Sequence, residues 1–145
     1  MSFNKVMFSS LTEHYGTPSS IYHELRKEFN FNFDPCPLNS EDRTSLLHKD
    51  WKGNAFVNPP YKNIKNFLHK GIFELHKGNL KVAVFLIPSR TDTQWWHNYV
   101  MRYADEIRFI EGRLKFNGAK NSAPFPSCVV VFRRGMNRTL SEFEK

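Results

Sequence analysis

Val82-Ala83-Val84-Phe85-Leu86-Ile87-Pro88 is the stretch that decides the fold of this 145-residue chain. The residues before Pro88 form an unbroken apolar run, so a strand formed here has no polar face to turn toward water. Such strands lie in the middle of parallel sheets that helices cover on both sides, and a proline ends the strand. The stretch therefore predicts a layered α/β fold.

The segment before this strand predicts one of the covering helices. Its apolar residues recur at helical spacing, and Gly78-Asn79 then provides a stop signal. The apolar stripe consists of Ile64, Phe67, Leu68, Gly71, Ile72 and Leu75.

Further upstream, the short apolar run Ala55-Phe56-Val57 predicts a strand that ends at Asn58-Pro59-Pro60-Tyr61. Proline donates no backbone hydrogen bond and its fixed φ prevents an immediate helix, so Asn58 is expected at the rim of the sheet. The amide oxygen of Asn58 and the carbonyl of Pro59 can accept hydrogen bonds from one planar amino group, while the Tyr61 ring covers the heterocycle that carries it. The alternative is a plain turn, since Asn and Pro are common turn residues.

The remaining elements continue the alternation of helices and strands. Thr17-Pro18 predicts a helix start, with Thr17 as N-cap and Pro18 at the first helical position. Alternation of Phe29, Phe31 and Phe33 predicts a strand that ends at Asp34-Pro35. Later elements are a helix capped by Thr91-Asp92-Thr93 that carries Trp95, Trp96, Tyr99 and Val100, and strands around Ile107, Phe109 and Cys128 to Phe132.

The fold class that follows is α/β, with a mostly parallel central sheet and flanking helices. Ligands of such sheets bind at the carboxyl ends of the strands. Asp34-Pro35, Asn58-Pro59-Pro60 and Pro88-Ser89-Arg90 all lie at predicted strand ends. All three motifs are therefore expected at the edge of the sheet where ligands bind.

Length and composition predict one domain, since 145 residues with 40% apolar and 24% charged residues are ordinary for a globular protein. We expect an N-terminal arm at 1–15, a domain at 16–133 and a tail at 134–145. The chain has neither a long apolar run nor a secretory signal, which predicts a cytoplasmic protein without a membrane segment. Its oligomeric state does not follow from the sequence.

Cysteine and histidine usage predicts neither a disulfide framework nor a metal site. Cys36 and Cys128 are the only two cysteines and form no Cys-x-x-Cys pair. His69 and His76 lie on the predicted second helix, where partly exposed surface positions are more common than metal ligands.

The charge balance favours a polyanionic partner. The net charge is +7, and 15% of the residues are aromatic and can supply stacking surfaces as well as core. Nucleic acid is therefore the leading partner, although many basic proteins bind nothing specific.

The motifs occur in the order found in a known family, and their residues are Thr17-Pro18, Phe33-Asp34-Pro35-Cys36, Asn58-Pro59-Pro60-Tyr61, Arg90-Thr91-Asp92-Thr93, Gly112-Arg113-Leu114-Lys115-Phe116 and Ala123-Pro124-Phe125-Pro126-Ser127. Between Thr17 and Phe132 the chain resembles the phage-type DNA N-6-adenine methyltransferases, which belong to the S-adenosylmethionine-dependent amino-methyltransferases. The resemblance implies a reduced Rossmann-like methyltransferase fold and a DNA substrate. It also implies action in the cytoplasm of a bacterium and a phage or prophage origin.

The resemblance also implies roles for individual residues. Asn58, Pro59, Pro60 and Tyr61 would be the catalytic motif, which holds the exocyclic amine of a flipped adenine. Thr17, Pro18, Asp34, Pro35 and Cys36 would hold S-adenosylmethionine, with Asp34 nearest the methionine ammonium. Arg90, Arg113 and Lys115 would contact DNA, although a solvated basic turn is an equal alternative for the last two.

The chemistry suits these residue types. The exocyclic amine of adenine is a poor nucleophile because its lone pair is delocalised into the ring, so acceptors that hold its hydrogens favour a reactive geometry. A methyl group on a sulfonium needs no acid, and catalysis can rest on alignment and electrostatics. This explains a predicted active site without His or Glu.

Several alternatives stay open. Cys36-Pro37-Leu38-Asn39-Ser40 has none of the glycines that many methyltransferases carry beside the cofactor, which is compatible with a non-catalytic DNA-binding protein that lost its cofactor. The methylated amine could instead be cytosine N-4, adenine in RNA or a glutamine side chain. Pro35-Cys36 also occurs in cytosine-ring methyltransferases, where the thiolate attacks the base.

Individual residues also have alternative roles. Thr17-Pro18 could be a plain helix start, and Asp34 could be a strand-end cap. The ribose-binding acid could be Glu41, Asp42 or Asp50.

Overall fold

The computed structural model describes residues 16–37 and 42–135, and the elements below refer to these. The expected arm at 1–15 lies outside them, as do Glu41 and all of the expected tail beyond Gly135. One four-stranded sheet has the order β1-β2-β4-β3. Its strands are β1 (Gly53–Val57), β2 (Leu80–Pro88), β3 (Glu106–Phe109) and β4 (Ser127–Arg133).

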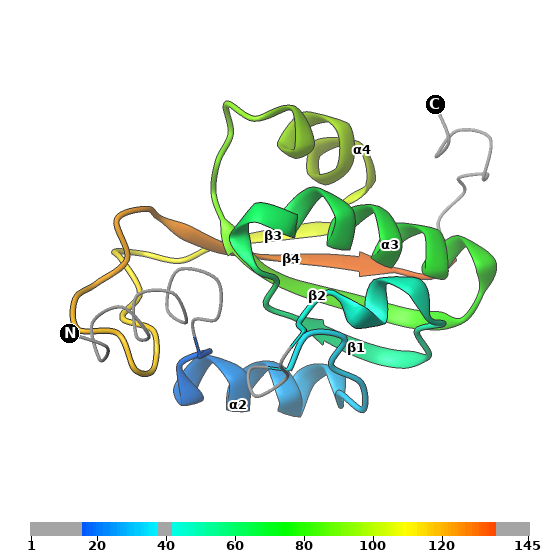
Figure 1. The fold of residues 1–145 in the computed structure, drawn as a ribbon, viewed down its shortest axis with the longest axis horizontal. Helices are drawn as coiled ribbons and strands as arrows, with labels where there is room; N and C mark the ends of the chain where they lie inside the picture. Colours follow the sequence, from blue (N-terminus) through cyan, green and yellow to red (C-terminus); the bar gives the residue numbers. More distant parts are fainter. Residues whose placement is uncertain (1–15, 38–41, 136–145) are drawn as a thin grey trace.

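Helices cover the two faces of this sheet (Figure 1). α2 (Ser19–Phe29) lies on one face and α3 (Ile64–Lys77) on the other, where the π-helical turn η3 (Trp96–Val100) and α4 (Met101–Tyr103) follow. Two short 3-10 turns, η1 (Ser45–His48) and η2 (Tyr61–Asn63), precede β1 and α3. The expected α/β fold class is therefore confirmed.

β2 divides the core into two halves, as its unbroken apolar run predicts. Ala83, Phe85 and Ile87 pack in the cluster beneath α3, whereas Val82, Val84 and Leu86 pack in the cluster against α2. Successive side chains of a strand point to opposite faces, so both faces of β2 must be apolar. The strand ends at Pro88, and α3 ends at Gly78 in the left-handed conformation with φ 87°.

The pairing of the sheet differs from the mostly parallel one that the sequence predicts. Only β1 and β2 pair in parallel, while β4 pairs antiparallel with both β2 and β3. β1, β2 and β3 thus run in one direction and β4 runs in the other. An apolar run indicates that both faces of a strand are buried, but it does not indicate whether the strand runs parallel or antiparallel to its neighbours. The segment 110–126 contains no helix to carry the chain back across the sheet, so β4 returns antiparallel.

The strand predicted at Phe29 to Phe33 is reduced to one parallel bridge between Phe33 and Ala55. Phe29 is the last residue of α2, and Asn30 ends the helix in the left-handed conformation with φ 54°. Phe29 and Phe31 then stack with ring centroids 6.0 Å apart in the cluster against α2. The alternation of the phenylalanines therefore arises from a helix end and an extended segment that share one core.

Two cap predictions have different outcomes. The cap at Thr91 to Thr93 is confirmed, because the Trp96 amide donates to Thr93 Oγ1 at 3.2 Å. Thr17 is not a helix cap, since Pro18 takes that position without a side-chain hydrogen bond and α2 begins at Ser19. The Thr17 hydroxyl contacts a different residue, which is described below.

Arg134, the first residue of the expected tail, is hydrogen-bonded to the chain around the start of β2. Its amide donates to Lys81 O at 2.9 Å, and its guanidinium donates to Leu80 O at 2.9 Å and to Gly78 O at 2.7 Å.

Within residues 16–37 and 42–135, no helix is long and apolar enough to cross a bilayer. The same residues contain no group of three or more His, Cys, Asp or Glu side chains placed to hold a metal ion. His69 Nδ1 lies 3.4 Å from the Tyr99 hydroxyl, and His76 Nδ1 lies 2.9 Å from Ile72 O.

Candidate active site

A cavity of about 210 Å³ lies at the carboxyl end of β1. Its lining consists of Gly16, Thr17, Asp34, Cys36, Arg43, Phe56, Asn58 and Asn117. Residues predicted for cofactor binding (Thr17, Asp34 and Cys36) therefore meet the first residue of the predicted catalytic motif. The sequence separates these groups by up to 41 positions, so only the folded sheet brings them together.

Asn58 is fixed at both its side chain and its backbone. It is 8% exposed, and its Nδ2 donates to Thr17 Oγ1 at 3.0 Å. Its carbonyl accepts from Arg43 Nη2 at 2.7 Å and from the Cys36 thiol at 3.3 Å. The contact with Thr17 uses the nitrogen end of the amide, so the oxygen end is the one that can accept a substrate hydrogen.

The rest of the predicted catalytic motif forms a rigid exit from β1. Pro59 and Pro60 are buried, and Tyr61 begins the short turn η2 in a half-buried position. The Tyr61 ring meets Phe125 edge-on, with centroids 5.0 Å apart. The loop before β4 therefore fixes the aromatic ring that is expected to cover the heterocycle, a contact that the sequence did not reveal.

Asp34 has the chemistry of an ammonium ligand. Its Oδ1 accepts from the Cys36 amide at 2.9 Å, which is the turn expected of a strand-end cap. The carboxyl remains accessible to solvent, but surrounding protein atoms desolvate it and raise its pKa above the ordinary 3.8. The Cys36 amide and the Arg43 charge partly oppose this rise in pKa. A bound cation would relieve the desolvated carboxylate.

Cys36 is unsuited to nucleophilic attack. It is 2% exposed, and burial, followed by the Asp34 charge, raises the pKa of its thiol to about 12. The thiolate is the reactive form of cysteine, whereas this thiol donates its hydrogen to Asn58 O. The alternative of a cytosine-ring methyltransferase therefore lacks its nucleophile. Pro35 is buried beside it, and Pro18 is half-buried at the start of α2.

Arg43 is a charged residue of this cavity that the sequence did not reveal. It is 4% exposed, and its guanidinium donates to the carbonyls of Cys36 and Asn58. Asp42 forms the turn that precedes it, because its Oδ1 accepts from the Thr44 amide at 2.9 Å and from the Thr44 hydroxyl at 2.7 Å. An Asp before a Thr is a recognisable turn signal, but nothing in the sequence indicates that the Arg between them is buried.

A comparison with family models decides the relationship. The model of the DNA N-6-adenine-methyltransferase (Dam) family matches residues 7–139. The chain belongs to this family. A search of curated proteins gave no match.

In this member of the DNA N-6-adenine-methyltransferase family, the candidate ribose ligands receive no support from the described residues. The Asp42 carboxylate is used by the turn to Thr44. Asp50 lies 3.9 Å from Lys77 Nζ at the C-terminal end of α3, which is the opposite end of β1 from Asn58.

The segment before β4 closes the cavity of this family member at another side. The Asn117 side chain donates to Thr17 O at 3.0 Å, and the Asn117 amide donates to Gly16 O at 2.8 Å. Of the predicted DNA contacts, Arg113 and Lys115 are exposed on this segment, and Arg90 Nε lies 3.5 Å from Asp92 Oδ1. None of these three residues lines the cavity itself.

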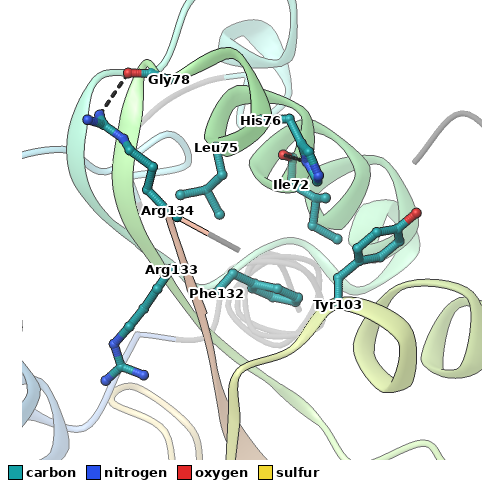
Figure 2. A pocket seen from close by; sticks show the side chains of 9 residues that line it. Ile72, Leu75, His76, Gly78, Tyr103, Phe132, Arg133 and Arg134 are labelled. Atoms are coloured by element: carbon teal, nitrogen blue, oxygen red, sulfur yellow. Dashed lines mark hydrogen bonds between the residues drawn. The ribbon is translucent and has the colours of Figure 1, made fainter. Parts of the chain in front are cut away.

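A second cavity, of about 230 Å³, lies at the other end of the sheet (Figure 2). Ile72, Leu75, Tyr103 and Phe132 give it a largely apolar and aromatic wall. Arg134 donates to Gly78 O there, and the Arg133 side chain extends away from the other labelled residues. None of the residues predicted for catalysis, cofactor or DNA lines this cavity.

Proposed function

We propose that this chain is a DNA adenine methyltransferase, which transfers a methyl group from S-adenosylmethionine to the exocyclic N-6 amine of a flipped adenine. The observation that carries the proposal is the cavity in which Asn58 meets Thr17, Asp34 and Cys36. This cavity occurs in a member of the DNA N-6-adenine-methyltransferase family, at the end of the strands where α/β sheets bind ligands.

The lining fits the methionine end of the cofactor. Asp34 offers a desolvated carboxylate for an ammonium group, Thr17 lines the same cavity, and Pro18 precedes α2. When bound, S-adenosylmethionine supplies the electrophilic methyl group. The missing glycines after Cys36 do not remove this carboxylate, so cofactor binding remains the expectation.

The amine is held by the catalytic motif. Asn58 Oδ1 and the Pro59 carbonyl accept the two amine hydrogens, and Tyr61 stacks on the ring. Stacking a base on an aromatic side chain contributes about 1 to 3 kcal/mol, which offsets part of the few kcal/mol needed to flip the base. The surplus proton on the amine nitrogen passes to solvent after transfer, so no side-chain base is needed.

DNA binding rests on exposed basic residues around this end of the sheet. Arg90 follows β2, and Arg113 and Lys115 lie on the segment that also contacts Thr17 through Asn117. We propose that they contact phosphates, which predicts that affinity for DNA falls as salt rises.

The finer fold and setting are proposed with the function. The shared direction of β1, β2 and β3, with helices on both faces, supports a reduced Rossmann-like methyltransferase fold. By family resemblance, the protein acts in the cytoplasm of a bacterium and has a phage or prophage origin.

The experiment is to incubate the protein with S-adenosylmethionine and unmethylated DNA, digest the DNA to nucleosides and quantify methylated bases by mass spectrometry. N-6-methyladenine is expected, and Asn58→Ala is the control in which the rate of its formation should fall about 10²- to 10³-fold. Detection of N-4-methylcytosine would show that the protein methylates another planar amine. RNA and protein substrates are tested in the same way. If nothing is methylated and calorimetry detects no cofactor binding, the non-catalytic DNA-binding protein is the correct alternative.

A further inference from the structure

The Arg43 guanidinium connects the two halves of the candidate active site. Its Nη2 lies 2.8 Å from Cys36 O and 2.7 Å from Asn58 O, and its Nε lies 3.3 Å from Cys36 O. Cys36 belongs to the segment predicted to hold the cofactor, and Asn58 to the motif predicted to hold the amine. One side chain thus spans segments that lie 22 positions apart in the sequence.

Burial of this charge indicates that its geometry matters. A buried guanidinium is costly to desolvate, and short charge-assisted hydrogen bonds only offset that cost when their geometry is good. The planar fork of arginine holds two acceptors in a fixed relation, which a lysine ammonium does not do. Because the Cys36 thiol donates to the same Asn58 carbonyl, two donors restrain the backbone that carries the Asn58 side chain.

The turn around Arg43 has hydrogen bonds of its own. Asp42 accepts from Thr44, and the Trp51 indole donates to Leu46 O at 2.8 Å. These contacts do not involve the guanidinium, so a conservative change at Arg43 should leave the turn formed.

We propose that Arg43 is a positioning residue for methyl transfer, which fixes the amine-holding Asn58 relative to the cofactor segment at Cys36. The inference rests on the proposed function and deepens it. Displacement of a reacting group by about 1 Å can reduce a rate by about 10²-fold, so loss of the fork should act on turnover more than on binding.

The experiment compares Arg43→Lys, which keeps the charge and loses the fork, with Arg26→Lys on the exposed side of α2 as matched control. For Arg43→Lys we expect kcat to fall about 10- to 100-fold, while the calorimetric Kd for S-adenosylmethionine changes less than about 3-fold. Arg26→Lys should leave both quantities unchanged. Thermal melting of each variant confirms that the compared proteins are folded.

A second variant separates positioning from general damage. Arg43 lines the cavity, so free guanidinium at millimolar concentration can reach the space left in Arg43→Ala. Partial recovery of kcat by guanidinium, without recovery by equal concentrations of sodium chloride, is expected. A misfolded site would not recover.

The outcomes distinguish the inference from the function on which it rests. If the unaltered protein makes no N-6-methyladenine, the proposed function fails before any variant is compared. If the unaltered protein is active and Arg43→Lys turns over at the same rate, the function stands and the inference is overturned. A loss confined to cofactor affinity would also overturn it, because Arg43 would then be a binding residue only.

Discussion

The two cavities at opposite ends of the sheet have similar volumes, about 210 and 230 Å³, but different lining residues. The first combines a carboxylate, a buried guanidinium and a buried amide. The second has an apolar and aromatic wall, with one histidine and two arginines beside it. The first lies at the end of β1, and the second lies beside α3 and the end of β4. The comparison shows that the size of a cavity does not tell the two apart, and that the kind and burial of the polar side chains do: three hydrogen-bonding side chains meet around the end of β1, whereas the basic side chains of the second cavity border an apolar and aromatic wall.

The largest expected effect is that of Asn58→Ala on turnover. Removing one hydrogen-bonding group that acts in the transition state typically costs about 10²- to 10³-fold in kcat. Single-turnover kinetics on an adenine-containing duplex should show this loss, while calorimetry shows cofactor binding close to that of the unaltered protein. Rapid methylation by the variant would show that methyl transfer does not take place in the first cavity.

A smaller effect is expected for Asp34→Asn on cofactor affinity. Hydrogen bonds to charged groups contribute about 1.5 to 3 kcal/mol, which corresponds to about 10- to 100-fold in the Kd for S-adenosylmethionine. Isothermal titration calorimetry without DNA measures this directly. An unchanged Kd would place the methionine end of the cofactor elsewhere.

The same carboxyl predicts a pH dependence with opposite signs for binding and stability. The pKa of Asp34 in the folded protein is raised above 3.8, so cofactor affinity should fall as the pH is lowered through that raised pKa. A raised pKa also means that the protonated carboxyl favours the folded state, an advantage that is lost as the pH rises. Asp34→Asn should therefore flatten the binding profile and raise the melting temperature at pH 7. A lowered melting temperature would contradict the desolvation argument.

Tyr61→Leu should weaken the capture of the flipped base. Loss of stacking costs about 1 to 3 kcal/mol, which corresponds to about 5- to 150-fold in kcat/KM for DNA. Tyr61→Phe keeps the ring and serves as the control. Fluorescence of 2-aminopurine at the target position reports base flipping, and an unchanged signal in Tyr61→Leu would assign the stacking to another ring.

Cys36→Ser should change kcat by less than about tenfold. A serine hydroxyl can still donate to the Asn58 carbonyl, and even loss of this hydrogen bond would cost only about 1 kcal/mol. A thiolate mechanism would instead be supported by complete loss of activity in the variant, together with a covalent adduct between the unaltered protein and DNA seen by mass spectrometry.

The smallest effect on activity is expected in the second cavity. Ile72 is 2% exposed there, and Ile72→Val should cost about 0.5 to 1.5 kcal/mol in the free energy of unfolding. Urea denaturation measures this cost, and kcat should remain unchanged. A clear fall in kcat of the folded variant would show that the second cavity affects activity at the first, and would contradict the separation of the two ends of the sheet.

Periodicity in the sequence was sufficient for the elements that bury a regular face. The stripe from Ile64 to Leu75 and the run from Val82 to Ile87 correspond to α3 and β2, because the core fixes which side of each element is apolar. Strand direction was not predictable, since β4 has the same apolar composition that a parallel strand would have. The prediction of a strand near Phe33 was wrong because a helix end and an extended segment share one phenylalanine-rich core.

For the candidate site, the residues predictable from the sequence were those at strand ends. Asn58 follows an apolar run, Asp34 follows the alternating phenylalanines, and both line one cavity. Arg43 and Asn117 escaped prediction because their contacts are with backbone carbonyls, which leave no pattern of residue types. The role of each predicted residue stays a prediction until the variants above are measured.

The bond between the Asn117 side chain and Thr17 O has a kinetic consequence. It joins residues 100 positions apart, so it can form only after nearly the whole described chain has been brought together. Contacts of this separation are slow to form because the entropy of closing a long loop must be overcome first. The wall of the cavity that this bond completes is therefore expected to assemble late in folding. A ligand of that cavity would bind the finished fold and not its precursors, and would slow unfolding by holding the start of the described chain against the segment before β4.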